Sequence, residues 1–220
     1  MNEINTVVCL HGIWAHGAGM YLIKRHLERE YGLRGLLFSY PSVKGTLDDN
    51  AALLSQFLRE QALEAAHIVG HSLGGVVALR MLANEPDTIP GRVVCLGSPL
   101  RGSRLAEMIS RIDWAEPILG NSLPEGVLNV AANEWATGVC RRREVGVVAG
   151  SVPVGIGRVA GQFDGPNDGT VAVAETELEG ARDHIVLQVS HTSMMISRQV
   201  ADQAGAFLKR GEFLRDAEST

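Results

Sequence analysis

The chain has 220 residues, of which 45% are hydrophobic and 20% charged, so it carries enough apolar material for one sizeable domain over residues 1–220. Its formal net charge is −5, with both signs mixed along the chain, and this composition disfavours nucleic acid as a partner. The three cysteines, Cys9, Cys95 and Cys140, form no Cys-x-x-Cys pair, so we expect them to be small core residues without metal or disulfide roles.

The beginning of the chain lacks the positive residues of a signal peptide, and its apolar run at 7–10 is too short to span a membrane. We therefore expect a cytoplasmic protein without a stable membrane anchor. Beyond that run, short β-branched segments alternate with longer segments of helical period, a pattern typical of a parallel sheet connected by helices. The sequence thus predicts an α/β fold with a mostly parallel sheet of about six strands and helices on both faces.

The predicted elements follow one another along the whole chain. We expect strands at residues 6–10, 36–40, 67–69, 92–96, 144–149 and 185–189. We expect helices at 21–31, 47–63, 73–83 and 194–208, the second of them capped by Thr46 and Asp49. Residues 103–140 contain Trp114 and Trp135, two prolines and no convincing strand, so they predict a small cap or lid outside the sheet.

The strongest chemical signal follows the third predicted strand. There the sequence Gly70-His71-Ser72-Leu73-Gly74 stands directly before a helix, which is the context of a nucleophile elbow. The glycines allow a sharp turn that exposes the Ser72 hydroxyl, and the helix start places positive partial charge beside it. A plain glycine-rich turn that closes a strand is the structural alternative.

A second signal follows the first strand. There His11-Gly12-Ile13 matches the loop that supplies an oxyanion donor in α/β enzymes with a nucleophile elbow. We expect the backbone N–H groups of Ile13 and Leu73 to form the oxyanion hole. His11 is interpreted as a residue that supports this loop through hydrogen bonds, in preference to a catalytic base.

The base and the acid are expected near the last two strands. His191 follows the last strand, so it belongs at the catalytic edge of the sheet, and the other histidines have structural interpretations. The acid is expected in the loop after the penultimate strand, where Asp168 is the preferred residue and Asp164 the alternative; both precede glycine, so a β-turn is the competing explanation. The order of these residues along the chain, Ser72, Asp168, His191, is the order expected for an α/β fold with a nucleophile elbow.

The motifs HGIW, GHSLGG, LGSPLRGS, NDGTV and SHTSM together resemble those of the bacterial lipase and esterase branch of the α/β-hydrolases, over nearly the whole chain. The resemblance implies the α/β-hydrolase fold and places Ser98 and Ser103 at the rim of the pocket. Calcium-binding relatives carry an acid shortly after the catalytic histidine, whereas His191 is followed by Thr192 and Ser193, so neither calcium nor another cofactor is expected. The implied site comprises Ile13, Leu73, Ser72, Asp168 and His191.

The sequence therefore predicts a serine hydrolase that cleaves small carboxylic esters through an acyl-enzyme intermediate. A thioesterase or acyltransferase with the same triad, and a non-catalytic binding protein on a hydrolase scaffold, are the alternatives. Apolar residues near the predicted site are candidates for binding the acyl group, with ordinary core packing as the alternative for each. These candidates are Trp14, Met20, Tyr21, Ile118, Leu119 and Trp135.

Overall fold

The protein is built around one parallel sheet, and the computed structural model describes residues 3–103, 132–154 and 165–215. Six strands lie in the order β2-β1-β3-β4-β5-β6, and every neighbouring pair is parallel. The prediction of a parallel sheet of about six strands is confirmed. The strands are β1 (Thr6–Leu10), β2 (Arg34–Phe38), β3 (His67–His71), β4 (Val93–Leu96), β5 (Val145–Gly150) and β6 (Asp183–Leu187).

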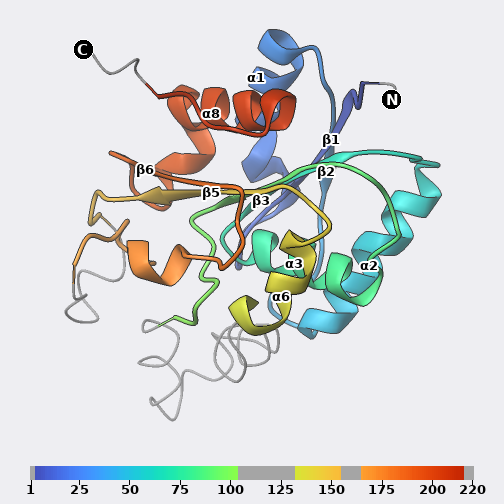
Figure 1. Cartoon of the computed structure of the whole chain (residues 1–220), viewed down its shortest axis with the longest axis horizontal. Helices are drawn as coiled ribbons and strands as arrows, with labels where there is room; N and C mark the ends of the chain where they lie inside the picture. The colour runs from blue at the N-terminus through green and yellow to red at the C-terminus, as the bar shows by residue number, and fades with distance from the viewer. Residues whose placement is uncertain (1–2, 104–131, 155–164, 216–220) are drawn as a thin grey trace.

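Helices cover both faces of the sheet (Figure 1). One face carries α1 (Tyr21–Tyr31) and α8 (Arg198–Arg210), and the other carries α2 (Leu47–Glu60), α3 (Leu73–Asn84) and α6 (Ala132–Cys140). Each layer has its own apolar cluster of side chains buried against the sheet. Because β1, β3, β4 and β5 are covered on both faces, their apolar residues run continuously and do not alternate with polar ones.

The predicted cap of α2 is present. The Asp49 N–H donates to the Thr46 hydroxyl oxygen (3.0 Å), and the Thr46 N–H donates to the Asp49 carboxylate (3.2 Å). This reciprocal pair satisfies two backbone donors that a helix start leaves without partners. The helix therefore begins where the sequence predicts, although it ends three residues earlier than expected.

Two strands begin and end two residues earlier than predicted, because pairing in the sheet outweighs local hydrophobicity. Strand β2 pairs Arg34 with Thr6, and the Arg34 N–H donates to the Asn5 carbonyl (2.6 Å). Strand β6, at the edge of the sheet, starts at Asp183. This polar residue does not fit the apolar pattern by which strands are predicted, so the predicted start was too late. In both cases the apolar residues beyond the strand, Tyr40 and Val189, are buried outside the sheet pairing.

The helices near the end of the predicted list also differ from the expectation. The last helix was expected from residue 194, but Ser193–Ile196 forms a short 3-10 turn, η4, and α8 begins only at Arg198. Ser197 between them is extended and caps α8 by accepting the Val200 N–H (3.3 Å). Helix α6 lies inside the predicted excursion, where its three polar residues and a glycine obscured the helical period.

Within residues 3–103, 132–154 and 165–215, no helix combines the length and the apolar character needed to cross a membrane. No cluster of three or more histidine, cysteine, aspartate or glutamate side chains in the same ranges could hold a metal ion. Cys9 and Cys95 are fully buried, as predicted, and Cys140 packs partly buried against the core.

Candidate active site

Ser72 lies at a sharp turn between strand β3 and helix α3. Its backbone has φ 53° and ψ −123°, a conformation that residues with a side chain rarely adopt. The Ser72 N–H donates to the Leu96 carbonyl (2.8 Å), and the Gly75 N–H donates to the Ser72 carbonyl (3.1 Å). The strained residue is thus fixed at the point where the carboxyl ends of β3 and β4 meet.

The two glycines of the motif are required by close approach of the backbone. A Cβ atom at Gly70 would collide with the backbone of Gly74 and Gly75 in the first turn of α3. A Cβ atom at Gly74 would lie 2.5 Å from the His11 carbonyl oxygen. Any side chain at either position would push the helix away from the strand and relax the turn at Ser72.

Asp168 and His191 form a buried pair beside this turn. The His191 ring donates from Nδ1 to Asp168 Oδ2 (2.7 Å), and the His191 backbone N–H donates to the Asp168 carbonyl (2.9 Å). Asp168 Oδ1 accepts the N–H groups of Thr170 (2.9 Å) and Val171 (2.7 Å), so both carboxylate oxygens have donors although the side chain is fully buried. The carboxylate is therefore fixed in orientation, and it leaves His191 Nε2 available for another partner.

The Asp168–His191 pair lies against Gly97, the residue that follows β4, and so it lies close to the turn at Ser72. A Cβ atom on Gly97 would lie 3.1 Å from Asp168 Oδ2 and 3.2 Å from His191 Nδ1. Leu96, its neighbour, accepts the Ser72 N–H, so the carboxylate, the imidazole and the serine gather around the end of one strand. No role was predicted for Gly97, although a glycine directly after a buried strand, as in LGSP, indicates a close backbone approach or a positive φ, and its φ is 58°.

The loop after β1 lies against the elbow and is supported as the sequence predicts. His11 Nδ1 lies 2.7 Å from the Gly12 carbonyl oxygen and donates to it, while His11 Nε2 accepts the Tyr40 N–H (3.3 Å). The Tyr40 hydroxyl donates to the His11 carbonyl (2.7 Å), and the two rings stack at 4.4 Å. His11 therefore supports the loop, and its ring nitrogens are occupied by these contacts.

This arrangement determines where the Ile13 N–H points. In a trans peptide the C=O and the following N–H point in opposite directions, so a Gly12 carbonyl held by His11 turns the Ile13 N–H to the other side. Gly12 itself touches Ser72, since a Cβ there would lie 2.9 Å from Ser72 Cβ. The Leu73 N–H belongs to the first turn of α3, where backbone donors have no acceptor within the helix.

Among the predicted acyl-binding residues, Trp14 is exposed and Met20 is buried. Trp14 follows the Ile13 loop with φ 55° and is 51% exposed, so it remains accessible beside the elbow. Met20 is fully buried and packs in the cluster beneath α1 and α8. The 3-10 turn η1 (Gly17–Met20) directs the Met20 side chain into the core, and its acyl-binding role stays a prediction.

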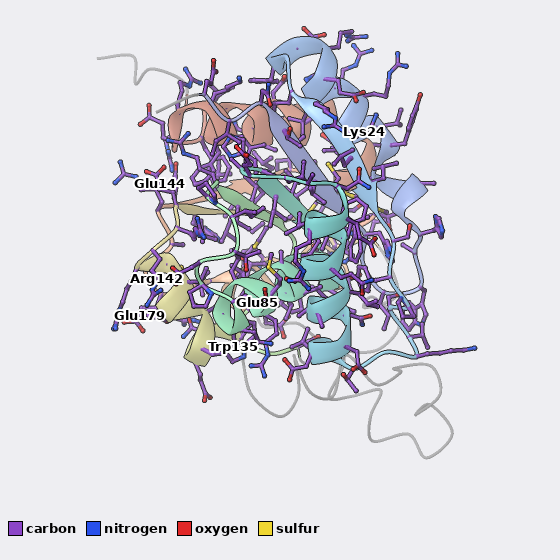
Figure 2. The ribbon with its side chains drawn as sticks, turned by 90° about the vertical axis from the view of Figure 1, so that its right-hand side faces the viewer. Lys24, Glu85, Trp135, Arg142, Glu144 and Glu179 are labelled. Atoms are coloured by element: carbon purple, nitrogen blue, oxygen red, sulfur yellow. The ribbon has the colours of Figure 1, made fainter. Side chains whose placement is uncertain are left out.

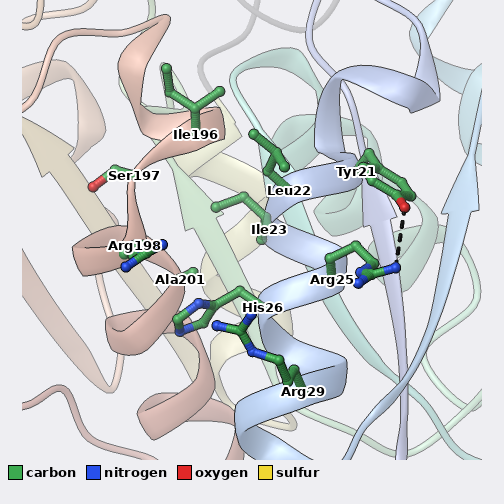
Figure 3. A pocket seen from close by; sticks show the side chains of 10 residues that line it. All are labelled: Tyr21, Leu22, Ile23, Arg25, His26, Arg29, Ile196, Ser197, Arg198 and Ala201. Carbon is green, nitrogen blue, oxygen red and sulfur yellow. Dashed lines mark hydrogen bonds between the residues drawn. The ribbon is translucent and has the colours of Figure 1, made fainter.

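Tyr21 lies on the outer surface of α1. Its hydroxyl faces the Arg25 guanidinium, which donates to it at 3.4 Å (Figure 3). The residue lines a surface groove of about 420 Å³ between α1 and the start of α8, and Ser72, Asp168 and His191 do not line this groove. Tyr21 thus contacts its i+4 neighbour on the helix surface, and its acyl-binding role stays a prediction.

Trp135 packs on the outer half of α3, away from its first turn. Its ring lies beneath the Arg80 guanidinium at 5.3 Å, two helical turns beyond Ser72. It also lines a cavity of about 180 Å³ with residues at the end of α3, and Figure 2 shows it near Glu85. Helix α6 turns this side chain toward Arg80 and the end of α3, and its acyl-binding role stays a prediction.

The remaining predicted residues are in two groups. Ile118, Leu119 and the alternative acid Asp164 lie outside the described residues. Ser98 is described and fully buried, and its hydroxyl packs against Gly75 in the first turn of α3, so it lies behind the elbow and not at the rim of a pocket. Ser103 is also buried.

Known proteins resemble this chain in sequence and in fold. It is 29% identical to the lipase LipV of Mycobacterium tuberculosis over 120 residues, which are 50% of this chain and 46% of that protein. The chain thus matches less than half the length of this relative. Its fold matches a lipase from Bacillus licheniformis in mature form, with a TM-score of 0.74 and 19% identity over 94% of this chain and 91% of the other.

A second solved structure, a carboxylesterase from Bacillus subtilis, has a TM-score of 0.61 and 14% identity, and covers 97% of this chain and 86% of its own. At these identities the two solved structures show a shared fold. The model of the alpha/beta hydrolase family matches residues 7–213, which include every described strand except the first residue of β1. The chain belongs to the alpha/beta hydrolase family.

Proposed function

We propose that the protein is a serine hydrolase that cleaves carboxylic esters, with Ser72 as nucleophile, His191 as general base and Asp168 as the acid that orients it. The observation that carries the proposal is the meeting of the strained Ser72 elbow and the buried Asp168–His191 pair at the end of β4. A structural turn has no need of a strained serine, and a buried carboxylate with three donors requires a reason to be kept.

In the proposed reaction His191 Nε2 removes the Ser72 proton while Oγ attacks the ester carbonyl. Asp168 holds Nδ1–H, which fixes the tautomer that leaves Nε2 free to accept, and its charge stabilises the imidazolium. The protonated ring then donates to the departing alcohol. A water molecule activated by the same ring breaks the acyl-Ser72 ester and releases the acid.

The oxyanion that forms in each step is assigned to the N–H groups of Ile13 and Leu73. Gly12, which touches Ser72, brings the first donor close, and the start of α3 supplies the second. Loss of one such donor from a comparable site costs about 3 kcal/mol of transition-state stabilisation. Both donors belong to the backbone, so the support of the Ile13 loop by His11 is the feature that a substitution can change.

The experiment for this proposal is a panel of soluble esters and matched thioesters that vary in acyl length, assayed with the wild type and with Ser72→Ala. Ester turnover that disappears in a folded Ser72→Ala variant supports the proposal. Preference for thioesters would assign the site to the thioesterase alternative, and no turnover of either class by the wild type would count against hydrolysis.

A further inference from the structure

His71 connects strand β3 to the loop that carries His191. It is the last residue of β3, it is almost completely buried, and its Nε2–H donates to the His191 carbonyl (3.0 Å). Its ring also packs on the His191 ring, with centroids 4.7 Å apart and planes inclined by 50°. On the other side it faces Gly12, where a Cβ atom would lie 3.2 Å from His71 Nδ1.

These contacts complete the hold on His191. Asp168 accepts the backbone N–H and the ring Nδ1–H of His191, while His71 binds the carbonyl oxygen and covers one face of the ring. The imidazole is therefore held from two sides, by His71 at the end of β3 and by Asp168 in the loop after β5. His191 lies beyond the end of β6 at Leu187, so strand pairing in the sheet does not fix its position.

We propose that His71 is a positioning residue for the base: its Nε2–H and its ring set the place of the His191 imidazole relative to Ser72. This inference rests on the proposed function. A displacement of a reacting group by about 1 Å costs up to about 100-fold in rate, so a contact that fixes the base has a measurable effect. Because His71 directly precedes the nucleophile, the strained turn and the base loop share one support.

The protonation state of His71 fits this role. Nε2 carries the proton that the His191 carbonyl accepts, and among the described residues Nδ1 has no hydrogen-bond partner. A proton on Nδ1 would be buried without an acceptor, and burial together with the neighbouring His191 lowers the pKa of His71 to about 3. The ring is thus neutral when His191 takes up a proton, and it adds no second positive charge beside the imidazolium.

The test compares two substitutions of His71, one that removes the hydrogen-bond donor and one that keeps it. His71→Phe keeps the ring and loses the donor, so kcat should fall between about 10- and 100-fold while KM stays within about two-fold. His71→Gln keeps an N–H near the place of Nε2, so it should recover most of kcat. A role limited to folding would lower the free energy of unfolding and leave kcat unchanged for each active site titrated with a fluorophosphonate.

A measurement on the wild type keeps the inference testable even where the Phe variant does not fold. Imidazole nitrogen NMR should show His71 as the neutral Nε2–H tautomer throughout pH 5 to 8. A protonated ring or the Nδ1–H tautomer in that range would overturn the inference, and so would wild-type kcat in a folded His71→Phe variant. Failure of wild-type Ser72 to react with the fluorophosphonate would instead reject the proposed function itself.

Discussion

Asp168 holds His191 by two separate hydrogen bonds, one to the ring and one to the backbone. Its Oδ2 accepts Nδ1–H at 2.7 Å, and its carbonyl accepts the His191 N–H at 2.9 Å, although the two residues are 23 positions apart. The loops after β5 and β6 are therefore locked together at the site. A substitution that keeps the backbone bond and changes only the carboxylate isolates the chemistry of the side chain.

Asp168→Asn is that substitution. Oδ1 receives two backbone donors, so the amide oxygen should occupy its place and the NH₂ should face His191 Nδ1. A donor there favours the wrong tautomer of the base, and kcat should fall by about 10⁴-fold with the fold intact. Asp164→Asn is the matched control and should cost far less; the reverse ranking in steady-state assays would transfer the role to Asp164.

Gly74→Ala should destabilise the protein and abolish activity, because its Cβ would press on the His11 carbonyl and move α3 from the elbow. Urea unfolding should show a loss of more than about 1 kcal/mol. Gly138→Ala in α6 is the control, since among the described residues no atom beyond its own helix backbone lies within 4 Å of the added Cβ, and alanine favours a helix by up to about 1 kcal/mol. Equal effects of the two changes would contradict the packing argument.

His11→Phe should slow the reaction without unfolding the protein. The phenyl ring can keep the stack on Tyr40, but the bond to the Gly12 carbonyl is lost and the Ile13 N–H is no longer held in direction. We expect kcat to fall at least about ten-fold. The corresponding loss of transition-state stabilisation should stay below the roughly 3 kcal/mol that removal of a whole oxyanion donor costs. His16→Phe, at the exposed neighbouring ring, should leave kcat near wild type, and a comparable loss there would contradict the assignment.

Acid should destabilise the fold through buried neutral histidines. Burial lowers the pKa of His67 from 6.5 to about 4 and that of His71 to about 3, so between those values and 6.5 only the unfolded chain binds these protons. The free energy of unfolding therefore falls as pH falls, by up to about 1.4 kcal/mol per pH unit for each ring. Urea titrations at pH 7, 6 and 5 measure this slope.

The His67→Asn variant tests the contribution of one ring. An asparagine oxygen can replace Nδ1 as the acceptor of the Arg92 N–H (3.0 Å), so the packing contact is kept while the titrating group is removed. The pH slope of the unfolding free energy should become smaller in this variant. An unchanged slope would show that other groups control acid unfolding.

The features that could be predicted from the sequence are those that local chemistry determines. The glycines around Ser72 encode a turn because a Cβ at Gly70 or Gly74 has no room, and the cap at Thr46 encodes a helix start. The positions of Asp168 and His191 follow from the order of the strands. Their proximity is now visible as a 2.7 Å hydrogen bond, although their catalytic roles remain a proposal.

The features that were missed depend on contacts between distant segments. Strand β2 begins at Arg34 because Thr6 pairs with it, and no local pattern encodes that register. Hydrophobicity shows that Met20 and Trp135 are apolar but not which way they point, so one lies in the core and the other beneath Arg80. The contact of His71 with His191 joins residues 120 positions apart and has no signal in the sequence.

The central claim is that Ser72 is the activated nucleophile, and covalent labelling with a fluorophosphonate tests it most directly. Treatment of the wild type followed by peptide mapping should place a single adduct on Ser72, and the folded Ser72→Ala variant should remain unlabelled. Asp168→Asn should react far more slowly than the wild type, because the base is no longer held in the active tautomer. Labelling that persists in folded Ser72→Ala, or an adduct mapped to another residue, would contradict the account.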